Sequence, residues 1–281
     1  SIVSSGSPIP ELPIDPVNTT STNEFYTYAL GTSSTYELTS YFESDKYQQT
    51  AANSGNPDPT TYAIGSNLSI TPFIHGLVGY WPLNEGSGTT AYDNSGWNNN
   101  GSLLDATTTD TGPTWTTTGC LNGGSCLSFD GTNDFIRVLN NASINPGSNN
   151  FSINVWFNAN AVAGIFYNKE NMYEAEAVTG YAWQPAWAWF GGGNLNTVTN
   201  QWIMMTVVYD HANQYLYRNG ILVYSRPQTG DMGTDTDNLT FAARQNGTTD
   251  FFSGLISDIN IYDSALTAAQ VQAIYNAEKS Q

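Results

Sequence analysis

The sequence predicts an all-β protein, a sandwich or jelly roll of antiparallel strands with one C-terminal helix. Short apolar runs recur at intervals of roughly ten residues from Gly76 onward, with turn residues between them. Charged residues, which include the helix formers Lys, Glu and Arg, make up only 11% of the chain, whereas aromatic residues reach 13%. Helical spacing of apolar residues is clear only at 267–279.

The composition also limits the partners. Lys and Arg total 7 against 24 Asp and Glu, which gives a formal net charge of -17. Such a surface repels nucleic acid and anionic membranes, so we expect no nucleic-acid partner. The charge suits a protein outside the cell and serves solubility by itself. It also allows cation binding where carboxylates converge.

Two cysteines, Cys120 and Cys126, flank the turn-forming residues LNGGS. A zinc site needs four ligands, but His75 and His211 are isolated, and the CxxC redox spacing is absent. We therefore predict a disulfide and an oxidising, extracellular setting. The alternative is two reduced, buried thiols.

Residues 1–75 form a first part of the chain that differs from the rest. Four prolines up to residue 16 indicate an extended linker or edge strand. The runs at 25–30, 36–43 and 62–70 are then typical of short antiparallel strands.

Four motifs in this first part resemble the C-terminal head of a bacterial type IV pilin or type II secretion pseudopilin. The resemblance implies other pilin subunits as partners, bound through an apolar N-terminal helix in the filament core. That helix is missing from the 281 residues, which suggests truncation to a soluble piece. The motifs are DPVN at 15–18, FYTY at 25–28, YELTSYFES at 36–44 and YAIGSNL at 62–68.

The second part, 76–281, carries the strand pattern of the sandwich. Asn219-Gly220 lies between two apolar runs and is the strongest hairpin signal in the chain. The predicted strands lie at or near 77–81, 127–129, 135–139, 151–157, 164–167, 186–190, 201–209, 214–218, 221–224 and 254–262.

Six motifs of this part, in order, resemble the laminin-G-like jelly roll of the concanavalin-A-like superfamily. The resemblance implies a concanavalin-A-like jelly-roll β-sandwich, frequently with a structural Ca²⁺. The motifs are LVGYWPLNEGSG at 77–88, DNSG at 93–96, LSFDGTNDFI at 127–136, FSINVWF at 151–157, YRNG at 217–220 and GLISDINIYDSAL at 254–266.

The C-terminal helix is predicted at 267–279. Thr267 and Gln270 have the spacing of a capping box. A narrow apolar stripe that includes Val271 and Ile274 would cover a sheet edge or the convex back of the sandwich.

Relatives of this fold hydrolyse glycans, so a catalytic pair of carboxylates has to be considered. Glu174 and Glu176 would share one face of a strand. Catalytic relatives place a tuning Asp between the pair, whereas this chain has Ala175. We therefore predict that the protein is not an enzyme and that the pair is solvated.

Calcium is the expected cofactor, in a structural role. Ca²⁺ binds six to eight oxygen ligands, and two regions are rich in them. One is the acidic loop at 231–238. The alternative for Asp93 is an Asx-turn or a cap within a Gly-rich loop. The preferred site is the polar loop after the first sandwich strand, with Glu85, Asp93, Asn94, Asn98 and Asn100, completed by Asp258.

An aromatic-rich stretch is the expected ligand surface, because sugar rings stack on aromatic side chains while polar groups bind their hydroxyls. Trp187 and Trp189 alternate along one strand face. The alternative is a place in the core, which we predict for Trp156 and Trp202. The proposed surface comprises Tyr181, Trp183, Trp187 and Trp189, with Asp134, Asn171 and Arg244 as polar contacts.

We therefore predict a pilin-like head at 1–75 and a laminin-G-like jelly roll at 76–281. The predicted function is a surface-exposed, non-catalytic subunit or adhesin of a type IV pilus or related filament, which binds a glycan or another cell-surface ligand. The alternative is a secreted, calcium-stabilised carbohydrate-binding module, and a glycan hydrolase ranks third. The predicted location is extracellular, on the cell surface or a filament.

Overall fold

The computed structural model describes residues 76–107, 112–177, 180–183, 195–244 and 246–279, together with the backbone of three short strands before them. Contacts between residues divide the chain into two compact units, Ser1–His75 and Gly76–Gln281. Within the described residues, no helix is long and apolar enough to cross a membrane.

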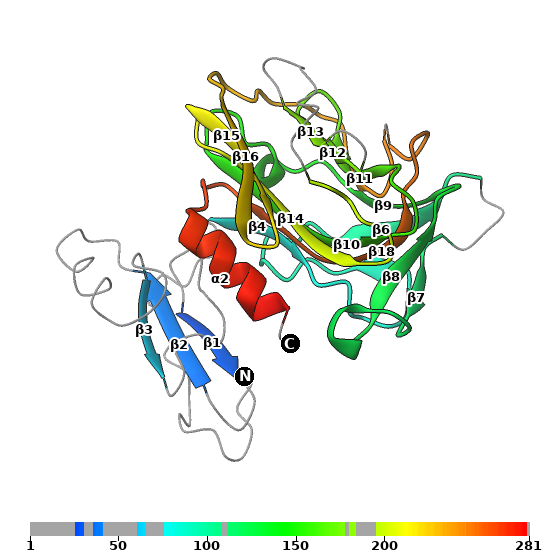
Figure 1. Ribbon diagram of the computed structural model, residues 1–281, viewed down its shortest axis with the longest axis horizontal. Helices are drawn as coiled ribbons and strands as arrows, with labels where there is room; N and C mark the ends of the chain where they lie inside the picture. The colour runs from blue at the N-terminus through cyan, green and yellow to red at the C-terminus, as the bar shows by residue number, and fades with distance from the viewer. Residues whose placement is uncertain are drawn as a thin grey trace. The chain divides into compact units, whose positions relative to one another are not determined.

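The first unit contains a small antiparallel sheet in the order β1-β2-β3 (Figure 1). Its strands are β1 (Tyr26–Leu30), β2 (Tyr36–Tyr41) and β3 (Thr61–Gly65). They coincide with the three apolar runs of this part, and each pairs antiparallel with its neighbour in sequence.

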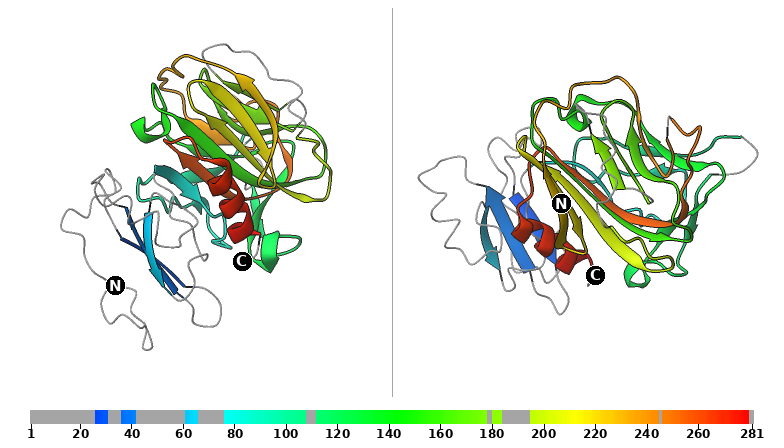
Figure 2. Two further views of the ribbon diagram at one scale, coloured as in Figure 1. Left: turned by 60° about the vertical axis from the view of Figure 1, so that its left-hand side comes forward. Right: turned by 45° about the horizontal axis from the view of Figure 1, so that its top comes forward.

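The second unit is a sandwich of two antiparallel sheets, as predicted (Figures 1 and 2). The first has the order β16-β15-β14-β10-β18-β8-β7, and β4 also pairs with β18. Its strands are β4 (Leu77–Trp81), β7 (Thr114–Thr116), β8 (Cys126–Asp130), β10 (Phe151–Ala159), β14 (Trp202–Tyr209), β15 (Asn213–Arg218), β16 (Ile221–Pro227) and β18 (Ser253–Tyr262).

The second sheet has the order β13-β12-β11-β17-β9-β6-β5. The predicted strand at 186–190 lies outside the described residues. The strands of this sheet are β5 (Thr90–Ala91), β6 (Gly101–Asp105), β9 (Asp134–Val138), β11 (Ile165–Lys169), β12 (Tyr173–Glu176), β13 (Gly180–Trp183) and β17 (Leu239–Phe241).

The core lies between the two sheets and follows from the alternation of side chains along each strand. On β10, Ile153 and Phe157 lie opposite Val207 and Ile203 of β14. All four are fully buried in the core cluster. Phe157 also stacks on Phe166 of the facing sheet, with ring centroids 4.1 Å apart.

The predicted hairpin at Asn219-Gly220 joins β15 to β16 and is confirmed. Both residues have positive φ, 53° and 80°, as a two-residue hairpin turn of this kind requires. The Asn219 side chain accepts a hydrogen bond from the Met204 N–H at 2.9 Å. A Cβ on Gly220 would meet the Gln272 amide at 2.8 Å, so the helix also favours glycine here.

The C-terminal helix α2 (Ala268–Glu278) has the predicted capping box, with Thr267 as N-cap and Gln270 as its partner. Val271 and Ile274 are its buried residues. The helix covers the outer face of the larger sheet, because Tyr275 stacks on Trp156 of β10 at 5.6 Å (Figure 2). Trp156 is therefore buried, as predicted, but it lies under the helix and not between the two sheets.

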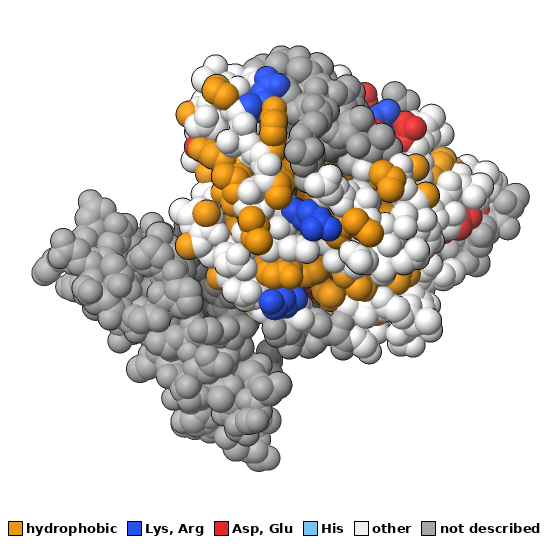
Figure 3. Space-filling model, viewed as in Figure 1, with side chains coloured by type: hydrophobic (Ala, Val, Ile, Leu, Met, Phe, Trp, Pro, Cys, Tyr) orange, Lys and Arg blue, Asp and Glu red, His pale blue; other side chains and the backbone are white. Residues whose placement is uncertain are grey.

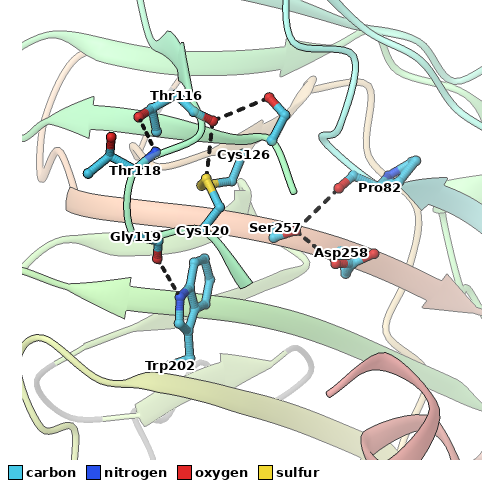
Figure 4. Close-up of a disulfide and its surroundings, with 10 residues drawn as sticks. Pro82, Thr116, Thr118, Gly119, Cys120, Cys126, Trp202, Ser257 and Asp258 are labelled. Atoms are coloured by element: carbon cyan, nitrogen blue, oxygen red, sulfur yellow. Dashed lines mark hydrogen bonds between the residues drawn. A yellow bond between two sulfur atoms is a disulfide. The ribbon is translucent and has the colours of Figure 1, made fainter. Parts of the chain in front are cut away.

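The predicted disulfide between Cys120 and Cys126 is present, with Cα atoms 5.6 Å apart (Figure 4). It closes the loop between β7 and β8. Trp202 lies next to this loop, where its indole N–H donates to the Gly119 carbonyl at 2.8 Å. Trp202 is half-buried and was wrongly predicted to be a core residue, because this polar contact keeps it at the rim.

Replacing both cysteines with alanine should lower the free energy of unfolding by about 2 kcal/mol, because the loop that the bond closes is short. For a unit of this size the melting temperature should fall by roughly 4–8 °C. All eight tryptophans lie in the second unit, so tryptophan fluorescence reports on the sandwich alone. Reductant should shift the wild type similarly and leave the variant unchanged; equal melting of all samples would contradict the prediction.

The larger sheet ends in an edge strand, β16, on which Ile221 and Leu222 are 65% and 47% exposed. In Figure 3, apolar and basic side chains are spread over the described face, and acidic ones lie toward its edges. The net negative charge is therefore distributed unevenly.

Candidate functional site

The outer face of the seven-stranded sheet carries a row of polar side chains. Asn168 of β11 lies opposite both Glu174 of β12 and Thr240 of β17. Their neighbours Tyr167 and Phe241 belong to the core cluster, so alternation places the polar row on the opposite face. All three polar residues are buried, which means that other groups cover them.

Arg244, which follows β17, covers this row. Its guanidinium forms two bonds to Glu174, from Nε at 2.8 Å and from Nη2 at 3.0 Å. The third nitrogen, Nη1, lies 2.8 Å from an Asp250 carboxylate oxygen, and Glu176 is 3.8 Å from Nη2. Asn168 donates to Glu174 as well, at 2.8 Å. One arginine thus connects three carboxylates at the surface of the sheet.

Burial and the contact between Glu174 and Arg244 act in opposite directions on the pKa of each group. Burial raises the pKa of the Glu174 carboxyl, while the bonds from Arg244 and Asn168 oppose that rise. Burial also acts to lower the pKa of Arg244, but the bonds and charge of Glu174 outweigh it and raise that pKa. A bidentate guanidinium–carboxylate contact favours both charged forms. Both carboxylate oxygens of Glu174 are therefore hydrogen-bonded to Arg244.

Of the predicted aromatic surface, the structure describes only the backbone of β13. β13 pairs with β12, and Tyr181 and Trp183 lie opposite Ala175 and Tyr173 in register. Ala175 and Tyr173 belong to the core cluster, so these two β13 positions lie on the opposite face of the sheet from Glu174, which Arg244 binds. Trp187 and Trp189 fall outside the described residues.

The structure does not bring the other predicted polar contacts to this surface. Asp134 is buried, and its carboxylate accepts from the Asp130 N–H at 3.0 Å, which anchors the turn between β8 and β9. Asn171 donates to Asp235 at 3.2 Å, in the acidic loop. A local turn thus occupies the Asp134 side chain and a distant loop occupies that of Asn171, and alternation along a strand reveals neither contact.

The predicted calcium loop is held together by Asp93. One of its carboxylate oxygens accepts the N–H groups of Tyr80 and Ser95, both at 2.9 Å. The other accepts the Asn99 N–H at 2.8 Å. These bonds match the alternative interpretation, an Asx-type anchor. Peptide donors on both oxygens leave Asp93 poorly suited to a metal ion.

Two of the other predicted calcium ligands accept backbone N–H groups at or next to Asp93. Glu85 accepts the Tyr92 N–H at 2.7 Å, and Asn100 accepts the Asp93 N–H at 2.8 Å. Asn98 is exposed. Asp258 instead contacts the Tyr80 hydroxyl at 3.4 Å and the Ser257 hydroxyl at 2.7 Å. No group of three or more His, Cys, Asp or Glu side chains in the described ranges could hold a metal. Calcium binding stays a prediction, and these donors do not fit it.

Sequence reasoning missed a buried polar cluster beneath α2. The Glu278 carboxylate accepts from the Trp156 indole at 2.6 Å and from the Asn260 and Asn154 amides at 3.0 and 3.2 Å. Burial and the nearby Asp258 raise its pKa well above the ordinary value. Asn154 and Asn260, polar residues in mainly apolar strands, were the available signal.

Comparison with known proteins supports the fold. The family model described as the Concanavalin A-like lectin/glucanases superfamily, of the laminin G type, matches residues 130–272. No curated protein matches the chain.

Among solved structures, domain 4 of AbnA, a GH43 extracellular arabinanase from Geobacillus stearothermophilus, in complex with arabinotriose, is similar with 18% identity and a TM-score of 0.55. The match covers 71% of this chain and 98% of that domain.

Two toxin domains are similar as well. The binding domain of Paraclostridial Mosquitocidal Protein 1 has 17% identity and a TM-score of 0.54. The receptor binding domain of botulinum neurotoxin D has 14% identity and a TM-score of 0.53. Each match covers 72% of this chain and 52% of the toxin domain, so the chain spans about half of their length. At these identities the likeness concerns the fold alone.

Proposed function

Because this chain belongs to the concanavalin A-like lectin/glucanases superfamily, we propose that its Gly76–Gln281 unit is a non-catalytic carbohydrate-binding domain that acts outside the cell. The observation that carries the proposal is the Arg244 cluster beside β13. It combines one guanidinium with the carboxylates of Glu174, Glu176 and Asp250, a set that suits sugar hydroxyls.

The same cluster argues against hydrolysis. A retaining glycosidase needs one carboxyl that donates a proton and a second, free carboxylate about 5–5.5 Å away. Glu174 instead has both oxygens bound to Arg244. Glu176 shares the same guanidinium at 3.8 Å. The similar structures, which are the binding domains of two toxins and a domain of an arabinanase in complex with arabinotriose, favour a binding role too.

The outer parts of the cluster are the ones that a ligand would contact. The Asp250 side chain is 48% exposed, whereas Glu174 is 5% exposed. Glu174 and Asn168 then orient Arg244 from below, so that its outer edge is fixed before the ligand arrives. Trp187 and Trp189, which follow β13 in the sequence, would supply the stacking surface.

A glycan array probed with the full chain tests the proposal. Trp187→Ala and Trp189→Ala should each reduce binding at least about fivefold, because a lost stacking contact removes roughly 1 kcal/mol or more. Trp115→Ala is the matched control, since Trp115 lies on β7 of the other sheet. Binding that is equal in the wild type and both test variants would contradict the proposal, as would no binding to any glycan.

We further propose that the first unit is a pilin-like head that places the sandwich on a type IV pilus or related filament. The antiparallel sheet β1-β2-β3, built from the pilin-like motifs, supports this proposal. Partner subunits would bind through an apolar helix encoded upstream of residue 1. The upstream coding sequence is the test: about 20 apolar residues after a short basic leader support a filament subunit. An ordinary cleaved signal with no apolar segment retained would favour a secreted binding module instead.

A further inference from the structure

Lys169, the last residue of β11, is fully buried. It lies opposite Tyr173 of β12 and Leu239 of β17, and both of these residues belong to the core cluster. An ammonium group in such a place is unfavourable unless nearby oxygens replace its hydration shell. The surroundings of its Nζ atom therefore need an explanation.

Two oxygens accept hydrogen bonds from the Lys169 ammonium. They are the Asn140 side-chain oxygen at 2.8 Å and the Asp237 backbone carbonyl at 2.5 Å. Burial lowers the pKa of Lys169 to about 8, while the charges of Asp235 and Asp237 act to raise it. A pKa of about 8 leaves the ammonium mostly protonated at neutral pH.

The oxygens around Lys169 belong to one braced network. Asn145 donates to the Asn140 oxygen and to the Asp235 carbonyl, both at 3.2 Å. The Asp235 carboxylate accepts from Asn171 at 3.2 Å and from the Asp237 N–H at 2.6 Å. Amide, carbonyl and carboxylate oxygens of this kind are the ligands that Ca²⁺ prefers, yet here an ammonium lies among them.

We infer that the Lys169 ammonium is the resident cation of the acidic loop at 231–238, and that it makes a calcium ion unnecessary in the sandwich. Lys169 offsets the charges of Asp235 and Asp237 and ties the loop to β11 through the Asp237 carbonyl. The preferred calcium loop also needs no ion, because peptide N–H groups already bind the Asp93 carboxylate.

Thermal unfolding of the full chain tests the calcium half of the inference. Tryptophan fluorescence reports on the sandwich alone, since all eight tryptophans lie in it. The wild type should melt at the same temperature, to within about 1 °C, in millimolar CaCl₂ and in excess EDTA. A rise of several degrees with calcium would overturn the inference, because a bound ion stabilises the folded state.

Lys169→Met tests the role of the Lys169 ammonium, since it removes the charge and keeps the length of the side chain. The melting temperature should fall by roughly 10 °C, as expected when one partner of a buried charged group is lost. In an Asp235→Asn, Asp237→Asn background, Lys169→Met should lower the melting temperature clearly less, because fewer uncompensated charges remain. This background also keeps the test informative if Lys169→Met alone does not fold. Equal losses in the two backgrounds, or no loss in the first, would overturn the inference.

Discussion

Asp93→Ala should lower the free energy of unfolding of the sandwich by about 4 kcal/mol, because it removes one carboxylate that satisfies three backbone N–H groups. The Tyr80 donor belongs to β4, so the loss also releases the polar loop from the first strand of the sandwich. The melting temperature followed by tryptophan fluorescence should fall by roughly 10 °C.

Asn94→Ala is the matched control, because Asn94 is the exposed neighbour of Asp93, and it should change stability by less than about 0.5 kcal/mol. Asp93→Asn should give an intermediate loss, since an amide keeps one acceptor and turns a donor toward the other N–H groups. The three effects should be the same with calcium and with EDTA. An Asp93→Ala loss that appears only when calcium is present would show that Asp93 is a metal ligand after all.

The sandwich was predictable because its signals are local and periodic. The alternation along β10 and the Asn219-Gly220 turn each determine a structure within a few residues. Thr267 and Gln270 do the same for the start of α2. These predictions are confirmed, and so is the short disulfide loop, for which the residues between the cysteines carry the turn.

The candidate site was not predictable in the same way, because its contacts join distant parts of the chain. Glu174 and Arg244 are 70 residues apart, and nothing near either residue indicates the pairing. Asp134 and Asp93 resembled ligands, since a carboxylate that accepts backbone N–H groups has the same residue type and loop context as one that binds a ligand. Trp156 alternates like a core residue, and only the position of α2 shows which face of the sheet it covers.

The electrostatic environment of Glu278 could not be predicted from the sequence either. In the sequence it is an ordinary C-terminal glutamate of an amphipathic helix. In the structure its carboxylate lies among Trp156, Asn154 and Asn260, with the Asp258 carboxylate nearby. The same region contains Tyr80 of β4 and Tyr262 of β18, both with raised pKa, while Lys279 lies over the Tyr275 ring. The carboxylates of Glu278 and Asp258 therefore lie near each other in a buried region under the helix.

Asp258→Asn should stabilise the sandwich by about 2 kcal/mol at pH 7, since the pKa of Asp258 is raised from 3.8 to about 6. Burial is the main cause of the rise, which the hydrogen bonds from Ser257 and Tyr80 oppose. Between these two values the folded state binds more protons than the unfolded state, so the stability from this group falls as pH rises from about 4 to about 6. The gain in the variant should be small near pH 4, grow through this range and then stay constant.

Urea unfolding followed by tryptophan fluorescence at several pH values measures that difference, and subtracting the wild type cancels the carboxylates that do not interact with Asp258. Glu278 is the carboxylate whose pKa Asp258 raises, so its contribution remains in the difference. Asp231→Asn is the control, because it removes the same charge from a side chain that is 70% exposed, and its effect should not grow with pH in this way. Glu278→Gln should also stabilise the protein as pH rises, since burial raises the pKa of Glu278 well above its ordinary value, although the new amide faces three donors and this offsets part of the gain. If Asp258→Asn instead destabilises the protein at every pH, the prediction is contradicted. The folded state would then require the Asp258 carboxylate as the acceptor for Tyr80 and Ser257, and the helix would pack over the two charged carboxylates of Asp258 and Glu278.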